Sequence, residues 1–229
     1  MPEQYTFQPK TFKCELKCQT CNFSLGPNRC CKVKVCIGIP YCRYHMQKAV
    51  KLEIKNSEYG KGIFAKADPL PRRRRRNAPA VVAPANDRRV VFSRGDEIIE
   101  YNGEEITKDE LEDRYGKHTA PYALEIDDEE RIYEDGACFR SIGTMINHNK
   151  RKKNVEFSQT DNGSPIIITA TKNILNGDQL YGDYGDDYSF DDKVVSKTTR
   201  TRRKATVEPA QSECARRALL RNTVRRNRH

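Results

Sequence analysis

The sequence contains no run of apolar residues that approaches the roughly 18 needed to cross a membrane as a helix. Its amino terminus is polar and does not resemble a secretory signal. We therefore expect no membrane partner. Nine cysteines would point to disulfides in a secreted chain, but without a signal, and with seven of them before residue 43, metal binding is the better interpretation.

Residues 14–45, called here the Cys-rich segment, hold seven cysteines and one histidine. The spacings Cys18-x2-Cys21 and Cys42-x2-His45 let two side chains bind one ion. Few large apolar residues are present, so metal would have to stabilise the segment. Eight candidate ligands could fill two tetrahedral zinc sites, or one site with spare thiols. We expect the ligands among Cys18, Cys21, Cys30, Cys36, Cys42 and His45, and for a single site we favour Cys21, Cys30, Cys42 and His45.

Charge is segregated along the chain, whose net charge is +10. Residues 1–92 carry 19 Lys and Arg against 6 Asp and Glu, residues 93–192 carry 11 against 24, and residues 193–229 carry 12 against 2. The acidic middle would attract a basic peptide, whereas the basic ends would attract nucleic acid or a nucleosome. The pattern therefore predicts two kinds of partner.

Two segments have the composition of irregular chain. Residues 68–88 contain Pro71, five consecutive arginines (Arg72 to Arg76) and Ala-Pro repeats, which predict a disordered insert. Its arginines could contact DNA or an acidic histone surface, act as a nuclear import signal, or simply be solvated. Residues 193–229 lack apolar periodicity and are predicted to be a basic, disordered tail.

The rest of the chain has mainly the pattern of β-strands. Strands are expected at residues 52–55, 90–92, 96–101, 122–126, 131–133, 155–157 and 165–170. A short helix is expected at residues 41–51. A second is expected at 107–115, where Thr107 is the N-cap and Glu110 completes a capping box.

Five motifs follow one another between Ile54 and Phe190. They are Tyr59-Gly60-Lys61-Gly62-Ile63-Phe64-Ala65, the segments 95–104 and 122–127, Asn147-His148, and Gly177-Asp178-Gln179-Leu180-x-x-Asp183-Tyr184-Gly185. The glycine motif lacks the spacing and the Lys-Ser/Thr pair of a phosphate loop. In this order, over about three-fifths of the chain, the motifs resemble those of SET-domain lysine methyltransferases. Cys-rich segments that end in Cys-x-x-His similarly precede SET domains encoded by large DNA viruses, so the chain resembles these viral members.

The resemblance implies a mainly β fold of several small sheets with a knot-like crossing near its carboxyl end and few short helices. A small zinc-stabilised module (residues 1–51) would precede the SET domain (residues 52–192, with the insert at 68–88). The implied catalytic residues are Tyr184, at the methyl-transfer pore, and Tyr122, which would bind the substrate amine. S-adenosylmethionine would be held by Gly60, Lys61, Gly62, Tyr101, Asn147, His148, Tyr184, Tyr188 and Phe190.

The sequence departs from the family pattern at several positions. Thr144-Met145 replaces a common Arg-Phe, and Asn149-Lys150 replaces Ser-Cys. That cysteine often joins a zinc cluster with a Cys-rich segment after the domain, but here only Cys214 lies downstream. Gln179 stands where Glu is usual. Gly182 stands where Phe or Tyr often tunes how many methyl groups are added. The degree of methylation is therefore open.

The resemblance favours an S-adenosylmethionine-dependent lysine methyltransferase and chromatin regulator that acts on histone tails. One alternative is a non-catalytic zinc and nucleic-acid-binding protein on a degenerate SET scaffold, and another is a methyltransferase of a non-histone basic protein. We expect nucleosome or DNA contacts through the insert and the tail. The expected location is nuclear chromatin, which would be that of an infected host cell if the chain is viral. Packaging in a virion is left open, and so is a homodimer.

Overall fold

The structure is a computed structural model, and it describes residues 2–6, 11–15, 19–27, 29–35, 39–58, 60–70, 87–116, 119–127, 130–160, 163–185, 188 and 195–196. Of residues 2–6, 11–15, 163–164 and 195–196 only the backbone is described. Most of the expected insert and of the expected tail therefore lies outside the described residues.

The elements are short. The first ten strands are β1 (Pro2–Thr6), β2 (Thr11–Glu15), β3 (Gln19–Thr20), β4 (Ser24–Gly26), β5 (Arg29–Cys30), β6 (Lys34–Val35), β7 (Leu52–Ser57), β8 (Gly60–Ala65), β9 (Val90–Phe92) and β10 (Glu97–Tyr101). The others are β11 (Glu104–Thr107), β12 (Ala123–Asp127), β13 (Ile132–Asp135), β14 (Asn147–His148), β15 (Val155–Thr160), β16 (Gly163–Ala170), β17 (Ile174–Leu175), β18 (Tyr181–Gly182) and β19 (Val195–Ser196). The helices are α1 (Arg43–Val50), α2 (Lys108–Tyr115) and the 3₁₀ turn η1 (Gly143–Met145).

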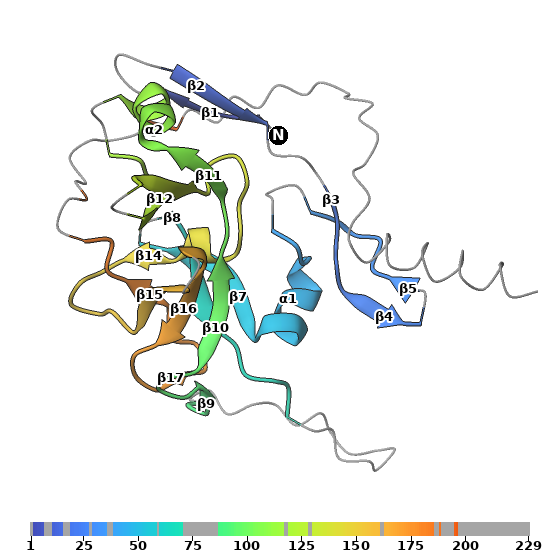
Figure 1. The fold of residues 1–229 in the computed structure, drawn as a ribbon. Helices are drawn as coiled ribbons and strands as arrows, with labels where there is room; N and C mark the ends of the chain where they lie inside the picture. The colour runs from blue at the N-terminus through green and yellow to red at the C-terminus, as the bar shows by residue number, and fades with distance from the viewer. Residues whose placement is uncertain are drawn as a thin grey trace, which may run out of the picture.

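Within the described residues, the strands form three sheets of three strands and five two-stranded pairs. The three-stranded sheets have the orders β10-β16-β15, β11-β13-β12 and β19-β1-β2. Figure 1 shows the β11-β13-β12 sheet beside α2, with β10, β16 and β15 below it and α1 on the side of β3, β4 and β5. The expectation of a mainly β fold of several small sheets with few short helices is confirmed.

The predicted elements appear with shifted ends. Helix α1 begins at Arg43 and ends where Lys51 takes a left-handed conformation (φ 53°), which closes the helix. Helix α2 has the predicted capping box: Glu110 N donates to Thr107 Oγ1 at 3.3 Å, and Thr107 N donates to Glu110 Oε2 at 2.8 Å. The strands that were not anticipated are β1 to β6, β8, β11, β14 and β17 to β19. Of these, β19 lies within the range expected to be irregular and pairs with β1.

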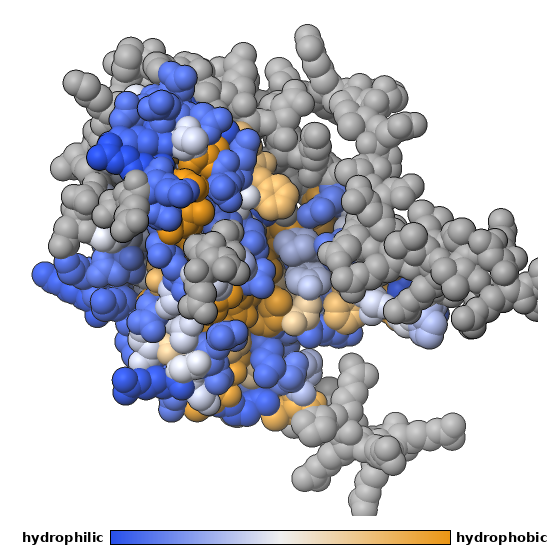
Figure 2. All heavy atoms as spheres, viewed as in Figure 1, coloured by the Kyte–Doolittle hydropathy of each residue, from blue (hydrophilic) through white to orange (hydrophobic). Residues whose placement is uncertain are grey.

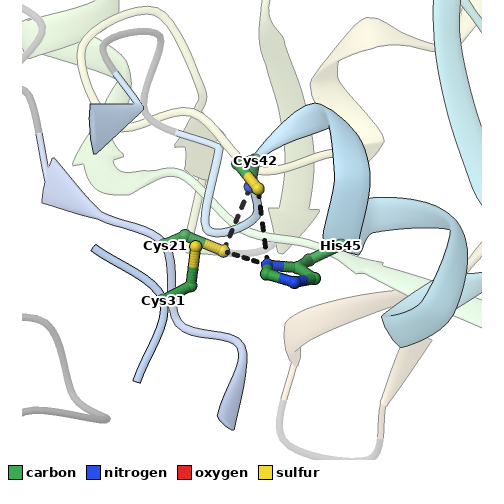
Figure 3. A group of neighbouring side chains, drawn as sticks. All are labelled: Cys21, Cys31, Cys42 and His45. Carbon is green, nitrogen blue, oxygen red and sulfur yellow. Dashed lines mark hydrogen bonds between the residues drawn. The ribbon is translucent and has the colours of Figure 1, made fainter. Parts of the chain in front are cut away.

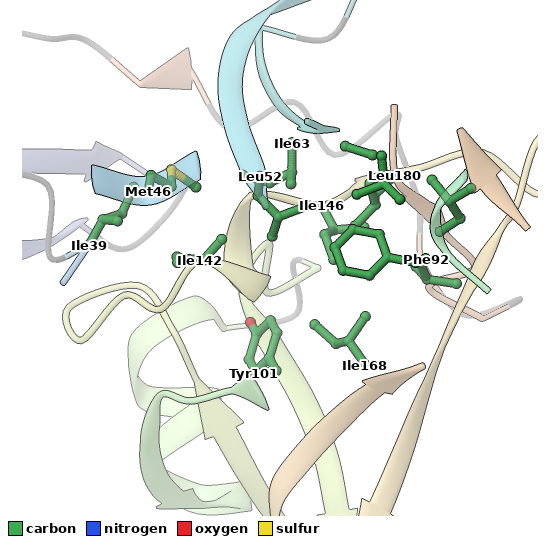
Figure 4. Packing of buried hydrophobic residues seen from close by; sticks show 14 of the residues in the cluster. Ile39, Met46, Leu52, Ile63, Phe92, Tyr101, Ile142, Ile146, Ile168 and Leu180 are labelled. Carbon is green, nitrogen blue, oxygen red and sulfur yellow. The ribbon is translucent and has the colours of Figure 1, made fainter. Parts of the chain in front are cut away.

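One hydrophobic core joins the Cys-rich segment to the sheets. Ile39 and Met46, on either side of the start of α1, belong to the same buried cluster as Leu52, Ile63 and Leu180. Figure 4 shows this row of side chains running from Met46 past Leu52 and Ile146 toward Leu180. In β16, alternate residues are buried because successive side chains of a strand face opposite sides. The expected boundary between residues 51 and 52 therefore runs through a shared core.

A buried carboxylate links α2 to the β11-β13-β12 sheet. Asp135 is fully buried, and its Oδ2 accepts hydrogen bonds from Arg114 Nη1 at 2.9 Å and from Tyr115 Oη at 2.8 Å. Its Oδ1 accepts from Ala137 N at 2.9 Å. Burial raises the pKa of Tyr115, so its hydroxyl keeps its proton and remains a donor to Asp135.

We predict that Asp135→Ala lowers the free energy of unfolding by about 1–3 kcal/mol, because it leaves the buried hydroxyl of Tyr115 without its acceptor and removes one of the two carboxylate partners of Arg114. Urea unfolding followed by circular dichroism measures this change. The matched control is Glu125→Ala, which removes a carboxylate at an exposed hydrogen bond and should cost under about 1 kcal/mol. Equal losses in the two variants would show that Asp135 does not anchor α2.

Candidate active site and metal site

The parallel pair of β14 and β18 brings two distant motifs together. It places Asn147 opposite Tyr181 and His148 opposite Gly182. Just beyond β18, Tyr184 N donates to His148 Nδ1 at 3.0 Å, and the Tyr184 hydroxyl donates to the carbonyl of Ile146. The Asn-His pair and Tyr184 therefore meet although 36 residues separate His148 from Tyr184.

The glycine motif lies against Asn147. Its side-chain amide Nδ2 donates to Ser57 Oγ at 2.9 Å and to the carbonyl of Lys61 at 3.2 Å, which fixes the β7-β8 hairpin next to β14. A Cβ atom on Gly62 would lie 2.9 Å from that amide and 2.4 Å from Gln179 Nε2, so the close approach requires glycine. Gly60 has φ +90° and open space around it. The loop thus presents bare backbone beside the Asn-His pair.

Aromatic rings gather around Tyr184. Its ring centroid lies 4.8 Å from that of Tyr188, with the planes at 71°, and 5.3 Å from that of His148. The rings of His148 and Tyr188 are nearly parallel, 6.3 Å apart. Phe157 completes the group at 6.4 Å from Tyr184. Edge-to-face and offset contacts of this kind hold rings in fixed positions.

These rings enclose a narrow cavity, called here the tyrosine pocket, with an open volume of about 30 Å³. The residues that line it are Tyr101, Ala120, Pro121, Tyr122, Ala123, Leu124, Gly143, Thr144, Ile146, Phe157, Tyr184 and Tyr188. Such a volume admits a slender group, such as the end of an alkyl amine. Tyr101, which was expected at the cofactor, lines this pocket, and its hydroxyl donates to the carbonyl of Tyr122.

Burial controls the protonation of the pocket. Burial raises the pKa of Tyr184, and the hydroxyls of Tyr188 and Tyr122 raise it further. Burial raises the pKa of Tyr101 and of Tyr188 as well. All three hydroxyls are therefore neutral at physiological pH. Neutral hydroxyls can both donate and accept hydrogen bonds.

Three residues of the site were not anticipated. Phe157 fills the space beside Gly182, where a Cβ atom would lie 2.4 Å from its Cε2. The buried Asn154 donates to the carbonyl of Gln179 at 2.9 Å and accepts from Tyr181 N at 2.8 Å, so it holds β18 in place. The Arg140 guanidinium lies 4.6 Å from the ring centroid of Tyr122. Only Phe157 had a signal in the sequence, namely its alternation with Val155, which is buried in the same strand.

A separate cluster in the Cys-rich segment could hold a metal ion. The ligand atoms of Cys21, Cys31, Cys42 and His45 all lie within 4.8 Å of one another (Figure 3). His45 Nδ1 is 3.5 Å from Cys21 Sγ and 3.4 Å from Cys42 Sγ. Tetrahedral zinc with Zn–S bonds of about 2.3 Å places sulfurs about 3.8 Å apart, so small side-chain shifts would suffice. Three thiols and one imidazole are a donor set that fits zinc.

The cluster differs from the favoured ligand set at one position, because Cys31 takes the place of Cys30. Cys30 lies opposite Ser24 in the β4-β5 pair and is disulfide-bonded. Adjacent side chains of extended backbone point to opposite sides, so only one of the two cysteines can face His45. Cys18 and Cys36 lie outside the described residues, as does Phe190 among the expected cofactor residues.

The described chain has no helix long and apolar enough to span a membrane. A search of the curated proteins gives no match. Residues 89–185 match the family model described as the SET domain.

Similar solved structures include three of the polycomb repressive complex 2. A structure described as ctPRC2 in complex with H3K27me3 and H3K27M has 26% identity and a TM-score of 0.43, over 59% of this chain and 14% of that chain. The polycomb repressive complex 2 of Chaetomium thermophilum has 25% identity and a TM-score of 0.46, over 64% of this chain and 16% of that chain. An autoinhibited ctPRC2 bound to S-adenosylmethionine has 25% identity and a TM-score of 0.45, over 61% of this chain and 16% of that chain. This chain thus spans 14–16% of the length of these proteins. Its small sheets and the match at residues 89–185 identify a SET fold.

Proposed function

We propose that this chain is a protein-lysine N-methyltransferase that uses S-adenosylmethionine and acts on histone tails. One observation carries the proposal: three segments converge on a single site within a SET fold. The glycine loop, the Asn147-His148 pair and Tyr184 meet through β14 and β18, beside a narrow pocket lined with tyrosines. A scaffold without catalysis has no need for all of these features together.

The reaction suits such a pocket. An attacking lysine amine must be neutral, although a free lysine has a pKa of about 10.4. Enclosure in an aromatic pocket lowers that pKa because burial disfavours the charged form. Aromatic faces also accept a cationic or methylated amine, and tyrosine hydroxyls orient its lone pair. The remaining requirement is alignment of the amine, which the packed rings of Tyr184, Tyr188 and Phe157 would provide.

The residues of the glycine loop fit the expected cofactor. S-adenosylmethionine would supply an electrophilic methyl group. Gly60 offers open backbone with a positive φ, and the hydrogen bonds of Asn147 hold the loop beside β14. We assign Gly60, Lys61, Gly62, Asn147 and His148 to the cofactor side, with Tyr122 and Tyr184 on the amine side.

The surroundings favour a basic substrate, because residues 93–192 carry 24 acidic against 11 basic residues. A lysine-rich histone tail would be attracted to this part of the chain. We further propose that the arginines of the insert and the basic tail contact the DNA of a nucleosome.

Incubation with labelled S-adenosylmethionine and separated core histones tests the proposed methyl transfer. Label on one histone supports the proposal, whereas label on another basic protein alone would change the substrate. No transfer at all would leave the SET fold as a scaffold.

We propose that the Cys-rich segment binds zinc through Cys21, Cys31, Cys42 and His45. Elemental analysis should then find zinc in the purified protein, and Cys31→Ser should lose one ion per chain. Cys30→Ser is the matched control at the adjacent residue outside the cluster: it breaks the disulfide of Cys30 but leaves the four proposed ligands in place, so it should retain that ion. Loss of zinc from Cys30→Ser but not from Cys31→Ser would restore the ligand set favoured from the sequence.

For catalysis we predict that Tyr184→Phe lowers kcat by about 100-fold or more, the scale of a lost positioning group. Tyr184 donates to His148 Nδ1 through its backbone N, which Tyr184→Phe keeps, so cofactor binding should persist. His148→Ala should instead weaken the binding of the cofactor. Calorimetry with S-adenosylhomocysteine and a peptide methylation assay separate the two effects. Tyr133→Phe is the control, because the Tyr133 hydroxyl donates to Glu125 at an exposed position outside the site. A turnover of Tyr184→Phe equal to that of the wild type would refute the assignment of Tyr184.

The number of methyl groups transferred should depend on Phe157. Its ring closes the tyrosine pocket where Gly182 has no side chain, so Phe157→Leu should enlarge the pocket and raise the share of higher methylation states several-fold. Mass spectrometry of a histone-tail peptide measures the distribution. Phe139→Leu, at an exposed position, should leave it unchanged. An unchanged distribution in Phe157→Leu, with activity retained, would mean that another wall limits the pocket.

A further inference from the structure

The structure has a second cavity, which is separate from the tyrosine pocket. A groove of about 700 Å³, called here the basic groove, runs between β6, α1 and β7. It shares no lining residue with the tyrosine pocket. Its volume falls in the range of about 300–1,000 Å³ that is usual for sites that bind small ligands. The proposed methyl transfer makes no use of it.

Positive charge surrounds this groove. Lys34, Arg43 and Lys55 line it, against one carboxylate, that of Glu53. Glu53 is already paired with Lys55 at 2.6 Å and with Lys66 at 3.4 Å. Among the described residues from 19 to 58 there are seven Lys and Arg against two Glu. The groove is therefore suited to an anionic partner.

Aromatic and apolar side chains lie among these cations. Tyr44 is 79% exposed, and Val33 is 47% exposed, although both border the groove. Figure 2 shows hydrophobic residues in the middle of this face, near the place of α1 and β7 in Figure 1, with hydrophilic residues around them. A flat ring that is open to solvent beside cations is the arrangement on which unpaired bases stack.

The metal cluster would hold this surface rigid. Tyr44 lies in the first turn of α1 between Cys42 and His45, both of which belong to the cluster. The ring of His45 stacks on Phe23 at 4.2 Å between centroids. A bound ion would fix the start of α1, and with it the direction of Arg43 and Tyr44. Preorganised aromatic and cationic groups lose little conformational entropy on binding.

We propose that the basic groove binds single-stranded nucleic acid, with a base stacked on Tyr44 and phosphates beside Lys34 and Arg43. A duplex hides its base faces in stacked pairs, so it would gain the phosphate contacts without the stacking. An acidic peptide would use the cations, but it has no base to stack on the exposed ring. The combination of cations with Tyr44 is the reason to favour a single strand over both.

The test measures fluorescence anisotropy of a labelled 12-nucleotide oligothymidylate with the full chain, at several salt concentrations. Tyr44→Ala should weaken binding by about 5- to 100-fold, the range of one lost stacking contact, while Tyr44→Phe should restore it. The double variant Lys34→Gln and Arg43→Gln should lower the slope of log affinity against log salt by about 1.4, or about 0.7 for each lost phosphate contact. Residues 193–229 are the same in every variant, so the differences report the groove.

The matched control removes the same charge outside the groove lining. The double variant Lys32→Gln and Lys48→Gln should reduce the affinity and the salt slope less than the double variant Lys34→Gln and Arg43→Gln does. Zinc content and peptide methylation should be equal in all variants, so a failed methyltransferase assay would not affect this proposal. Equal affinity of Tyr44→Ala and wild type, equal losses in both double variants, or tighter binding of an acidic peptide than of the oligonucleotide would overturn it.

Discussion

The parallel pairing of β14 with β18 is the contact on which the site depends. Two residues on each strand set the register, and the bond from Tyr184 N to His148 Nδ1 extends it by one step. Asn154 holds the far side of β18 through its own amide. Because Asn147 also holds the β7-β8 hairpin, this short pair fixes the glycine loop and the tyrosine pocket relative to each other. A short backbone pair and a few side-chain hydrogen bonds thus position groups from three distant parts of the sequence.

Sequence patterns succeeded where local rules decide the structure. The capping box at Thr107 and Glu110 depends on a three-residue spacing, and the strands on alternating burial. Motif order predicts that Asn147, His148 and Tyr184 share one site, and the structure brings Tyr184 into contact with His148. In each case the information lies within a few residues, or in the resemblance of several motifs at once.

What the sequence could not decide was the direction of side chains and the filling of space. Cys30 and Cys31 are adjacent and chemically identical, so spacing cannot say which one faces His45, whereas the β4-β5 pair does. Gly182 stands where the family often has Phe or Tyr, and Phe157 from another strand occupies that space. The guanidinium of Arg140 lies over the ring of Tyr122. These features depend on tertiary packing, which local patterns do not encode.

The shared core gives the metal cluster a physical route to the site. Cys42 and Met46 pack in the same buried cluster as Leu52 and Ile63. Ile63 lies next to Gly62 in β8, and its carbonyl accepts a hydrogen bond from Leu180 N at 2.9 Å, one residue before β18. Close-packed interiors transmit displacements, since no void absorbs them. A shift of α1 on loss of the proposed zinc ion would therefore reach both the glycine loop and β18, which precedes Tyr184. The Cys-rich segment is thus packed into the same core as the site.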